Sequence, residues 1–494
     1  MSDLNCTFAQ ISLTWLVMLR APSVRLGQLG TTMTSAQPMQ HHPAVSDDIL
    51  LDTGARGPMF EEISPRLPDF KLGVTHSWTR GQPFDFYRRM REEAPVMWSQ
   101  IRKPSSGFWS VVRYDDVKHV ELNPQIFSSQ RGSINMSVLR NDKGKAERLM
   151  YAAYNSLINL DADLHRDLRT QQAAFFFPAY IETLKEKVGR KIDDLLDDME
   201  RQGPIVDFAK LFSIELPMFT LCEMLGVDEE DRADIIKWMH YLELAPQFIT
   251  HPFRMLLAEP SFPFRFEKIL HDMFSYGERV MADRIKNPRE DLLTVIANAT
   301  LGAKPPSQSY LDGSWLLIVF AGNDTTRNSL SGTIRLLTQF PEQRQLVLND
   351  PSLIERMSHE ALRMVSPVMH MRRTAVEDTE LAGQRIAKDE KVIMWYGAAN
   401  RDPAVFPDPD NFDMMRDNVE KHLAFGHGVH RCLGNRVAQL QLKMAYERIL
   451  ERFPHIYWTG KQKIEPIILV HAISSLQVNL YGKDGKRPVM VATS

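Results

Sequence analysis

Cysteine is scarce in this chain of 494 residues, which contains only Cys6, Cys222 and Cys432. An odd number of widely separated cysteines does not make a disulfide framework and is typical of a reducing compartment. The sequence therefore predicts a cytoplasmic protein without structural disulfides.

Long hydrophobic runs are also missing. The most apolar early segment, Phe8–Leu19, is interrupted by polar residues and is shorter than the ~20 residues that a membrane-spanning helix needs. No membrane anchor is expected, and no basic segment precedes this run as it would in a signal peptide. Residues 1–60 are rich in Ser, Thr, Gln, Pro and His without periodicity, so we predict a disordered N-terminal extension before a folded domain at 61–494.

Neither sign of charge dominates the chain. Lys and Arg number 59 against 62 for Asp and Glu, which gives a net charge of -3. This balance excludes a global basic field for nucleic acid or for an anionic membrane, so partners must be recognised locally. Residues 178–284 form a succession of helical patterns without internal repeats, which predicts a helix-rich fold.

Several segments carry patterns of particular elements. Helices are expected at Pro83–Glu93, Leu311–Phe340 and Asn435–Phe453. Trp98 and the run Phe108–Val112 predict a hairpin, and Lys391–Trp395 predicts a strand. Weak periodicity in residues 131–160 predicts a loop-rich segment over a pocket, although a plain surface loop is the commoner explanation.

One cysteine lies on a glycine-rich loop, Phe425–Gly434, directly before the amphipathic run that starts at Asn435. The free N–H groups and the dipole at a helix N-terminus favour a thiolate, so we expect Cys432 to have a lowered pKa that suits a metal ligand. Gly426 and Gly428 let the backbone turn tightly, and Phe425 offers a flat apolar surface. The alternative is an ordinary buried cysteine, which would be preferred if the loop stood alone.

A second unusual stretch lies inside the long apolar helix that Pro341 ends. Ala321–Thr326 places glycine, an acid and two threonines in the middle of a helix, against propensity, which predicts a local requirement that opposes regularity. The alternative is a helix with a surface acid and a threonine bonded to the carbonyl four residues earlier.

The spacing Phe-x-x-Gly-x-x-x-Cys-x-Gly resembles the haem-ligand loop of the cytochrome P-450 family, and two further family signatures precede it in order. Within the family, Gly322–Ser329 and His430–Arg436 look most like bacterial soluble members that hydroxylate alkanes, fatty acids or linear terpenoids. The resemblance implies a mainly α fold, a triangular helical prism with a small β-rich lobe, and haem b (iron protoporphyrin IX) as cofactor.

The resemblance also implies roles for individual residues. Cys432 would be the axial ligand of the haem iron. Thr325 would hydrogen-bond dioxygen, Asp324 would relay protons, and Gly322 would leave room above the haem. Contacts to the haem and its propionates are implied for His165, Arg169, Arg373, Phe425, His430 and Gly434.

A structural role is implied for three further residues. The Glu360/Arg363 pair, at i and i+3 on a helix, would join Arg416 in an ion network that braces the haem loop. Asp167 stands where family members often carry another arginine, so neutralisation of the propionates would rest more on other groups.

The activity implied is monooxygenation, the hydroxylation of a hydrophobic small molecule with dioxygen. The chain has no flavin or nicotinamide fingerprint and no iron–sulfur cysteine cluster, so electrons are expected from a separate ferredoxin and its reductase. We expect a monomer that binds no nucleic acid. Two alternatives are a peroxide-driven haem peroxygenase and a non-catalytic haem sensor or carrier; retention of Asp324 and Thr325 argues against the first, because peroxide already carries the protons they would supply.

Overall fold

The computed structural model describes residues 72, 78, 81–100, 107–133, 147–250, 259–301, 304–465, 467 and 469–483. The extension predicted at residues 1–60 lies outside the described residues. The described part of residues 40–494 forms one compact unit.

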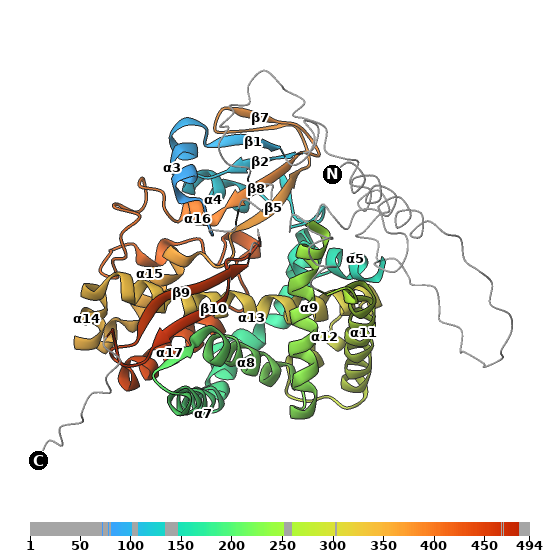
Figure 1. Ribbon diagram of the computed structural model, residues 1–494. Coiled ribbons are helices and arrows are strands. Elements are labelled where there is room, and N and C mark those ends of the chain that lie inside the picture. Colours follow the sequence, from blue (N-terminus) through green and yellow to red (C-terminus); the bar gives the residue numbers. More distant parts are fainter. Residues whose placement is uncertain are drawn as a thin grey trace, which may run out of the picture. The chain divides into compact units, whose positions relative to one another are not determined.

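Helices make up most of this unit (Figure 1). They are α3 (Phe84–Glu93), α4 (Tyr114–Leu122), α5 (Glu147–Tyr154), α6 (Ala162–Ala173), α7 (Pro178–Gln202), α8 (Glu215–Leu225), α9 (Arg232–Thr250), α11 (Phe262–Lys286), α12 (Leu292–Ala297), α13 (Gln308–Gln339), α14 (Pro341–Asn349), α15 (Ile354–Val365), α16 (Tyr396–Ala399) and α17 (Asn435–Arg452). Short helical turns include η8 (Val419–Lys421) and η9 (Gly428–His430).

The strands form three small sheets. Their bounds are β1 (Val96–Gln100), β2 (Gly107–Val111), β3 (Phe127–Ser128), β4 (Ile205–Asp207), β5 (His370–Ala375), β6 (Thr379–Leu381), β7 (Gln384–Ile386), β8 (Lys391–Trp395), β9 (Tyr457–Glu465) and β10 (Ala472–Asn479). The largest sheet has the order β1-β2-β8-β5-β3, in which only β2 and β8 pair in parallel. The others are β4-β10-β9 and the hairpin β6-β7. This confirms a mainly helical fold with a small β region.

Helix α13 lies at the centre of the main apolar core and contacts α5, α8, α11, α15 and α17 (Figure 1). It follows an N-cap, Ser307, whose hydroxyl accepts a hydrogen bond from the Tyr310 amide, and its last residue, Gln339, is followed by the C-cap Phe340 and by Pro341. Because proline cannot continue a helix, the predicted end is confirmed. The helix is uninterrupted through Ala321–Thr326, so the expected irregularity is not seen at the level of secondary structure.

The prediction of a loop-rich segment at residues 131–160 is partly wrong. Residues 147–154 form helix α5, which packs on α13. A Cβ at Gly313 of α13 would clash with the backbone of Ala152 and Asn155, so this glycine permits the close helix contact. Sequence periodicity missed α5 because its stability comes from this packing rather than from a long amphipathic pattern.

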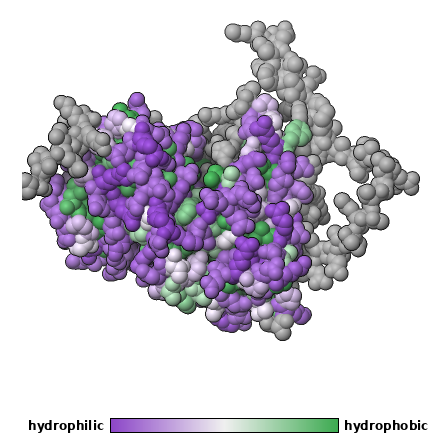
Figure 2. Space-filling model, turned by 90° about the horizontal axis from the view of Figure 1, so that it is seen from below, coloured by the Kyte–Doolittle hydropathy of each residue, from purple (hydrophilic) through white to green (hydrophobic). Residues whose placement is uncertain are grey.

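Other local predictions are confirmed. Strands β1 and β2 pair antiparallel, with Trp98 opposite Trp109, as the predicted hairpin requires. Strand β8 spans the predicted residues, and α17 begins at Asn435. Among the described residues no helix is long and apolar enough to cross a membrane. The face in Figure 2 is mainly hydrophilic, with hydrophobic residues scattered over it.

Candidate functional site

The loop that carries Cys432 is shaped by two glycines with left-handed backbone angles. Gly426 has φ of 66° and Gly428 has φ of 64°, a region that other residues rarely adopt. A Cβ on Gly428 would lie 2.5 Å from the carbonyl oxygen of Glu121, at the end of α4. The predicted need for tight turning is confirmed, and its cause is the close approach of α4.

Cys432 is held by backbone contacts at the start of α17. Its N–H donates to the Phe425 carbonyl at 2.8 Å, and Asn435 Nδ2 donates to the Cys432 carbonyl at 2.6 Å. The residue is solvent-accessible, yet the surrounding protein desolvates its thiol. The thiol is therefore open to solvent on one side and enclosed by protein on the others.

The expected lowering of the Cys432 pKa is wrong for the protein alone. Burial raises the pKa of this thiol, and this effect exceeds the opposing effects of the Gly434 N–H and the charges of Arg169 and Arg431. The helix N-terminus acts as expected, since the Gly434 N–H lowers the pKa, but it is outweighed by desolvation. A bound cation would supply the missing stabilisation of the thiolate.

Four basic side chains gather beside this loop. The rings of His165 (α6) and His430 (η9) lie 4.2 Å apart between centroids. Burial lowers the pKa of both histidines, and the charges of Arg169 and Arg373 lower it further. Arg169 Nη2 also donates to the Arg431 carbonyl at 2.5 Å, which ties α6 to the loop. The structure thus brings together residues that the sequence places on three separate segments.

Two acids lie near this basic cluster, Asp161 and Glu121, and the charge of Arg373 acts on Glu121. Asp161 lies 3.3 Å from His430 Nε2, and its other oxygen accepts the Ser128 hydroxyl at 2.6 Å. His165 is buried, and desolvation together with the neighbouring positive charges lowers its pKa to about 3. Such a cluster is suited to an anion, and the carboxylates of a haem would meet this requirement.

One face of α13 is accessible although most of the helix is buried. Ala321 is exposed, while Leu317, Ile318 and Thr325 are half-buried. Residues spaced by three and four positions share one side of a helix, so these positions form a continuous stripe. Thr325 Oγ1 lies 3.4 Å from the Ala321 carbonyl, the bond expected of a threonine in a helix.

The acid beside this stripe is buried. Asp324 pairs with Arg327, one turn further along α13, at 3.0 Å between Oδ1 and Nη2. Both side chains are buried, so the alternative of a surface acid is wrong. The pairing with Arg327 was not predicted, although its i, i+3 spacing could have indicated it.

Two predicted glycines have different surroundings. A Cβ on Gly322 would lie 2.9 Å from Leu221 Cδ1, so this glycine permits the packing of α13 on α8. Its role in leaving room above a haem stays a prediction. Gly434 is the N-cap of α17, and a Cβ there would have 3.8 Å to Phe176, so space does not require a glycine.

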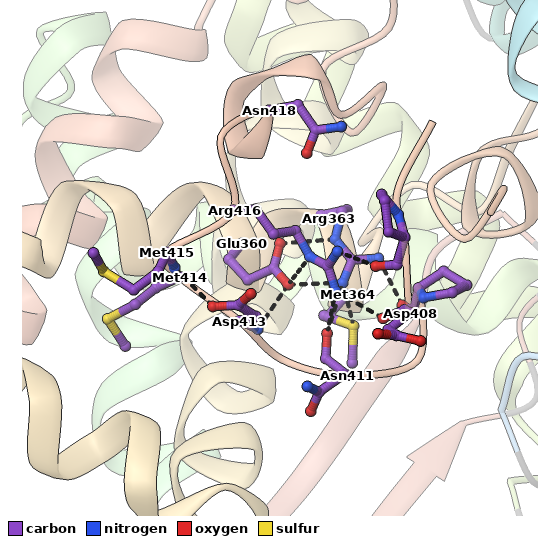
Figure 3. Close-up of polar contacts among 12 residues, drawn as sticks. Glu360, Arg363, Met364, Asp408, Asn411, Asp413, Met414, Met415, Arg416 and Asn418 are labelled. Atoms are coloured by element: carbon purple, nitrogen blue, oxygen red, sulfur yellow. Dashed lines mark hydrogen bonds and ion pairs between the residues drawn. The ribbon is translucent and has the colours of Figure 1, made fainter. Parts of the chain in front are cut away.

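The predicted ion network is confirmed. Glu360 accepts two hydrogen bonds from Arg363 at 2.7 Å each and one from Arg416 Nε at 3.1 Å (Figure 3). Arg363 also donates to the carbonyls of Asn400 and Asn411, at 2.9 and 3.1 Å. The network therefore fastens the 400–416 segment to α15.

Sequence reasoning missed Glu121, Asp161 and Tyr396. Glu121 is buried at the end of α4, where its Oε1 accepts the hydroxyl of Tyr396 at 2.6 Å. Asp161 is the N-cap residue of α6, but its carboxylate bonds Ser128 and His430 rather than an amide of the helix. No local pattern could have indicated these contacts, because each joins residues far apart in the chain.

Comparison with known proteins gives a consistent result. The family model "Cytochrome P450" matches residues 68–478. A linalool 8-monooxygenase of Pseudomonas putida is 32% identical over 82% of this chain and 97% of its own length. Cytochrome P450-terp of a Pseudomonas species is 30% identical over 76% of this chain and 89% of its own. A Mycobacterium marinum cytochrome P450 solved in complex with pseudoionone superposes with a TM-score of 0.74 at 29% identity, covering 85% of this chain and all of its own.

Proposed function

The chain belongs to the cytochrome P450 family, and from that premise we propose that it hydroxylates a terpenoid, alkane or fatty acid at a haem held by Cys432. Members of this family are haem b monooxygenases that act on hydrophobic molecules. The net reaction inserts one oxygen atom of dioxygen into a C–H bond and reduces the other to water, with two electrons and two protons supplied.

The residues of the candidate site fit the haem. Cys432 would hold the iron, and Phe425 would pack beside the ring. His165, Arg169, Arg373 and His430 would bind the propionates, because two guanidinium groups and two imidazole rings gather there as hydrogen-bond donors for anions. A thiolate-ligated haem supplies electron density that favours cleavage of the O–O bond.

The accessible stripe of α13 is proposed as the opposite wall of the haem space. Thr325 Oγ1 would donate a hydrogen bond there once it leaves the Ala321 carbonyl. Asp324 would pass protons from Oδ1, which first has to leave Arg327. The ion pair therefore fixes where this carboxylate lies before a proton is passed.

The substrate class is inferred from the same stripe and from the relatives. The stripe side chains Leu317 and Ile318 are aliphatic, so they favour an apolar ligand by exclusion of water. Among the similar proteins are a linalool 8-monooxygenase, a cytochrome P450 solved with pseudoionone, and a methyl-branched lipid omega-hydroxylase of Mycobacterium tuberculosis. A linear terpenoid or fatty chain is our first expectation.

A ferredoxin is the proposed electron donor, acting on a cytoplasmic monomer. Arg431, Arg436 and Lys443 are exposed around the Cys432 loop. They would attract an acidic partner to the shortest route to the haem. The alternative, that they only solvate an exposed helix, keeps some support because Lys443 lies 4.0 Å from Glu355.

Salt separates these two possibilities. If docking is electrostatic, reduction by the ferredoxin should slow as ionic strength rises, since the Debye length is about 10 Å at 0.1 M. Reversing the charge at Arg431 should slow stopped-flow reduction at low salt. Electron transfer that ignores both changes would show that the partner binds elsewhere.

The accessible yet desolvated Cys432, next to the cluster of His165, Arg169, Arg373 and His430, is the observation that carries the proposed function. The reduced carbon monoxide complex of the purified protein should show the red-shifted Soret band of thiolate ligation, and Cys432→Ala should lose it. A wild type without that band, or a variant that keeps it, would overturn the assignment. Substrates are then found by the spectral shift that they cause across terpenoids, alkanes and fatty acids.

A further inference from the structure

Glu121 is a buried acid on which the Cys432 loop rests. It is the penultimate residue of α4, and 3% of its surface is exposed. A Cβ on Gly426 would lie 3.1 Å from its Oε1, and a Cβ on Gly428 would lie 2.5 Å from its carbonyl oxygen. Both left-handed glycines of the loop therefore fold around this one residue.

The two oxygens of the Glu121 carboxyl differ in their partners. Tyr396 donates its hydroxyl to Oε1 at 2.6 Å, and the backbone N–H of His427 also donates to this carboxyl. Oε2 is buried without a hydrogen-bond partner in the part of the chain that the structure describes. A buried carboxylate oxygen without a donor is costly, so this oxygen is the natural place for a proton.

The charges around Glu121 compete with its burial. Arg373 on β5, the Tyr396 hydroxyl on α16 and the His427 N–H of the loop all favour the ionised form. Lys118 of α4 and Arg431 of the loop act on the neighbouring His427. Burial is the largest effect, and it raises the pKa of Glu121 to about 7. Both forms of the carboxyl are therefore populated near neutrality.

We propose that Glu121 is a positioning residue of the haem loop and that its uptake of a proton raises the reduction potential of the haem. The inference rests on the haem site proposed above. An anion beside the loop and beside Arg373 stabilises the oxidised, more positive haem. When Oε2 takes a proton from solvent that anion is lost, so the one electron delivered by the external donor is accepted more readily.

The test is a spectroelectrochemical titration of the holoenzyme between about pH 5.5 and 8.5, a range centred on the raised value. The wild-type potential should fall as pH rises, with an inflection near neutrality. A tenfold difference in proton affinity between the two oxidation states would appear as about 59 mV. Glu121→Gln keeps an acceptor for both donors but carries no charge, so its potential should stay high and lose this inflection.

Two further variants separate charge from structure. Asp116→Asn is the matched control, because Asp116 is another acid of α4 whose pKa burial raises, but it lies near Arg113 and Asp402. The reduction potential of Asp116→Asn should depend on pH as that of the wild type does. Tyr396→Phe removes a donor to the carboxylate and should move the inflection to higher pH, which a merely structural role would not do.

Potentials of Glu121→Gln that follow pH as the wild type does would overturn the inference, as would a wild-type potential that is constant with pH. The reduced carbon monoxide spectrum distinguishes this failure from a failure of the haem site. If the red-shifted Soret band is present in both proteins while their potentials coincide, only the role of Glu121 is wrong. If the band is absent from both, the proposed function fails and this inference fails with it.

Discussion

Replacing Glu360 by Gln tests how much the buried ion network of Glu360, Arg363 and Arg416 contributes to the free energy of unfolding. Glu360 and Arg363 are completely buried, and Arg416 is nearly so. The carboxylate accepts two hydrogen bonds from Arg363, one from Arg416 and one from the Asp413 amide at 2.9 Å. It is the one carboxylate on which both arginines converge in Figure 3.

The expected loss of stability follows from the two cations, Arg363 and Arg416, that would remain buried without the carboxylate. Removing one partner of a buried pair typically costs about 3–5 kcal/mol, because the other charge stays desolvated. Arg363 keeps its carbonyl acceptors at Asn400 and Asn411, so we expect the lower part of this range. Denaturant unfolding of Glu360→Gln should therefore give a free energy of unfolding about 3 kcal/mol below that of the wild type.

The control is Glu355→Gln on the same helix. Glu355 is 70% exposed, and its nearest cation, Lys443, lies 4.0 Å away. An exposed pair of this kind is worth about 0–1 kcal/mol, so this variant should unfold like the wild type. A loss below about 1 kcal/mol for Glu360→Gln would refute the reasoning, because the arginines would then be solvated or repaired by other acceptors.

Three further predictions follow from the site. Thr325→Ala should leave haem and substrate binding intact but divert reducing equivalents to peroxide; unchanged coupling of cofactor consumption to product would contradict the proposed role. Gly428→Ala should destabilise the protein by more than the about 1–3 kcal/mol of left-handed strain, since its Cβ meets Glu121. Gly383→Ala, with φ of 79° and open space, should show strain alone when both variants are compared by denaturant unfolding. Burial lowers the pKa of His422 to about 3. Below pH ~6.5 the unfolded chain therefore binds a proton at this residue that the native protein does not bind. As the pH falls from about 6.5 to about 3, the free energy of unfolding should decrease by up to about 1.4 kcal/mol per pH unit. His422→Asn should flatten this acid slope; an unchanged slope would show that other groups cause it.

Local patterns predicted the elements near the site. Pro341 marked the end of the long helix, and Gly426 and Gly428 marked the turns of the cysteine loop, because prolines and left-handed glycines act through their immediate neighbours. The start was predicted three residues late, at Leu311, because the cap Ser307 was not recognised. The segment 147–154 escaped prediction because its helix is stabilised by packing on α13 around Gly313. The network of Glu360, Arg363 and Arg416 was predicted from the resemblance to a family, because the sequence spacing alone does not indicate that Arg416 contacts Glu360.

The electrostatic character of the site was decided by the tertiary structure. The sequence by itself determined that Cys432 stands before a helix, and this local setting favours a thiolate. Desolvation by segments that are distant in the sequence raises the pKa of Cys432 instead of lowering it. Desolvation also raises the pKa of Glu121 to about 7. Burial and Coulomb interactions depend on which segments pack together, and His165, His430, Arg373 and Glu121 meet only after α4, α6, β5 and the loop have assembled.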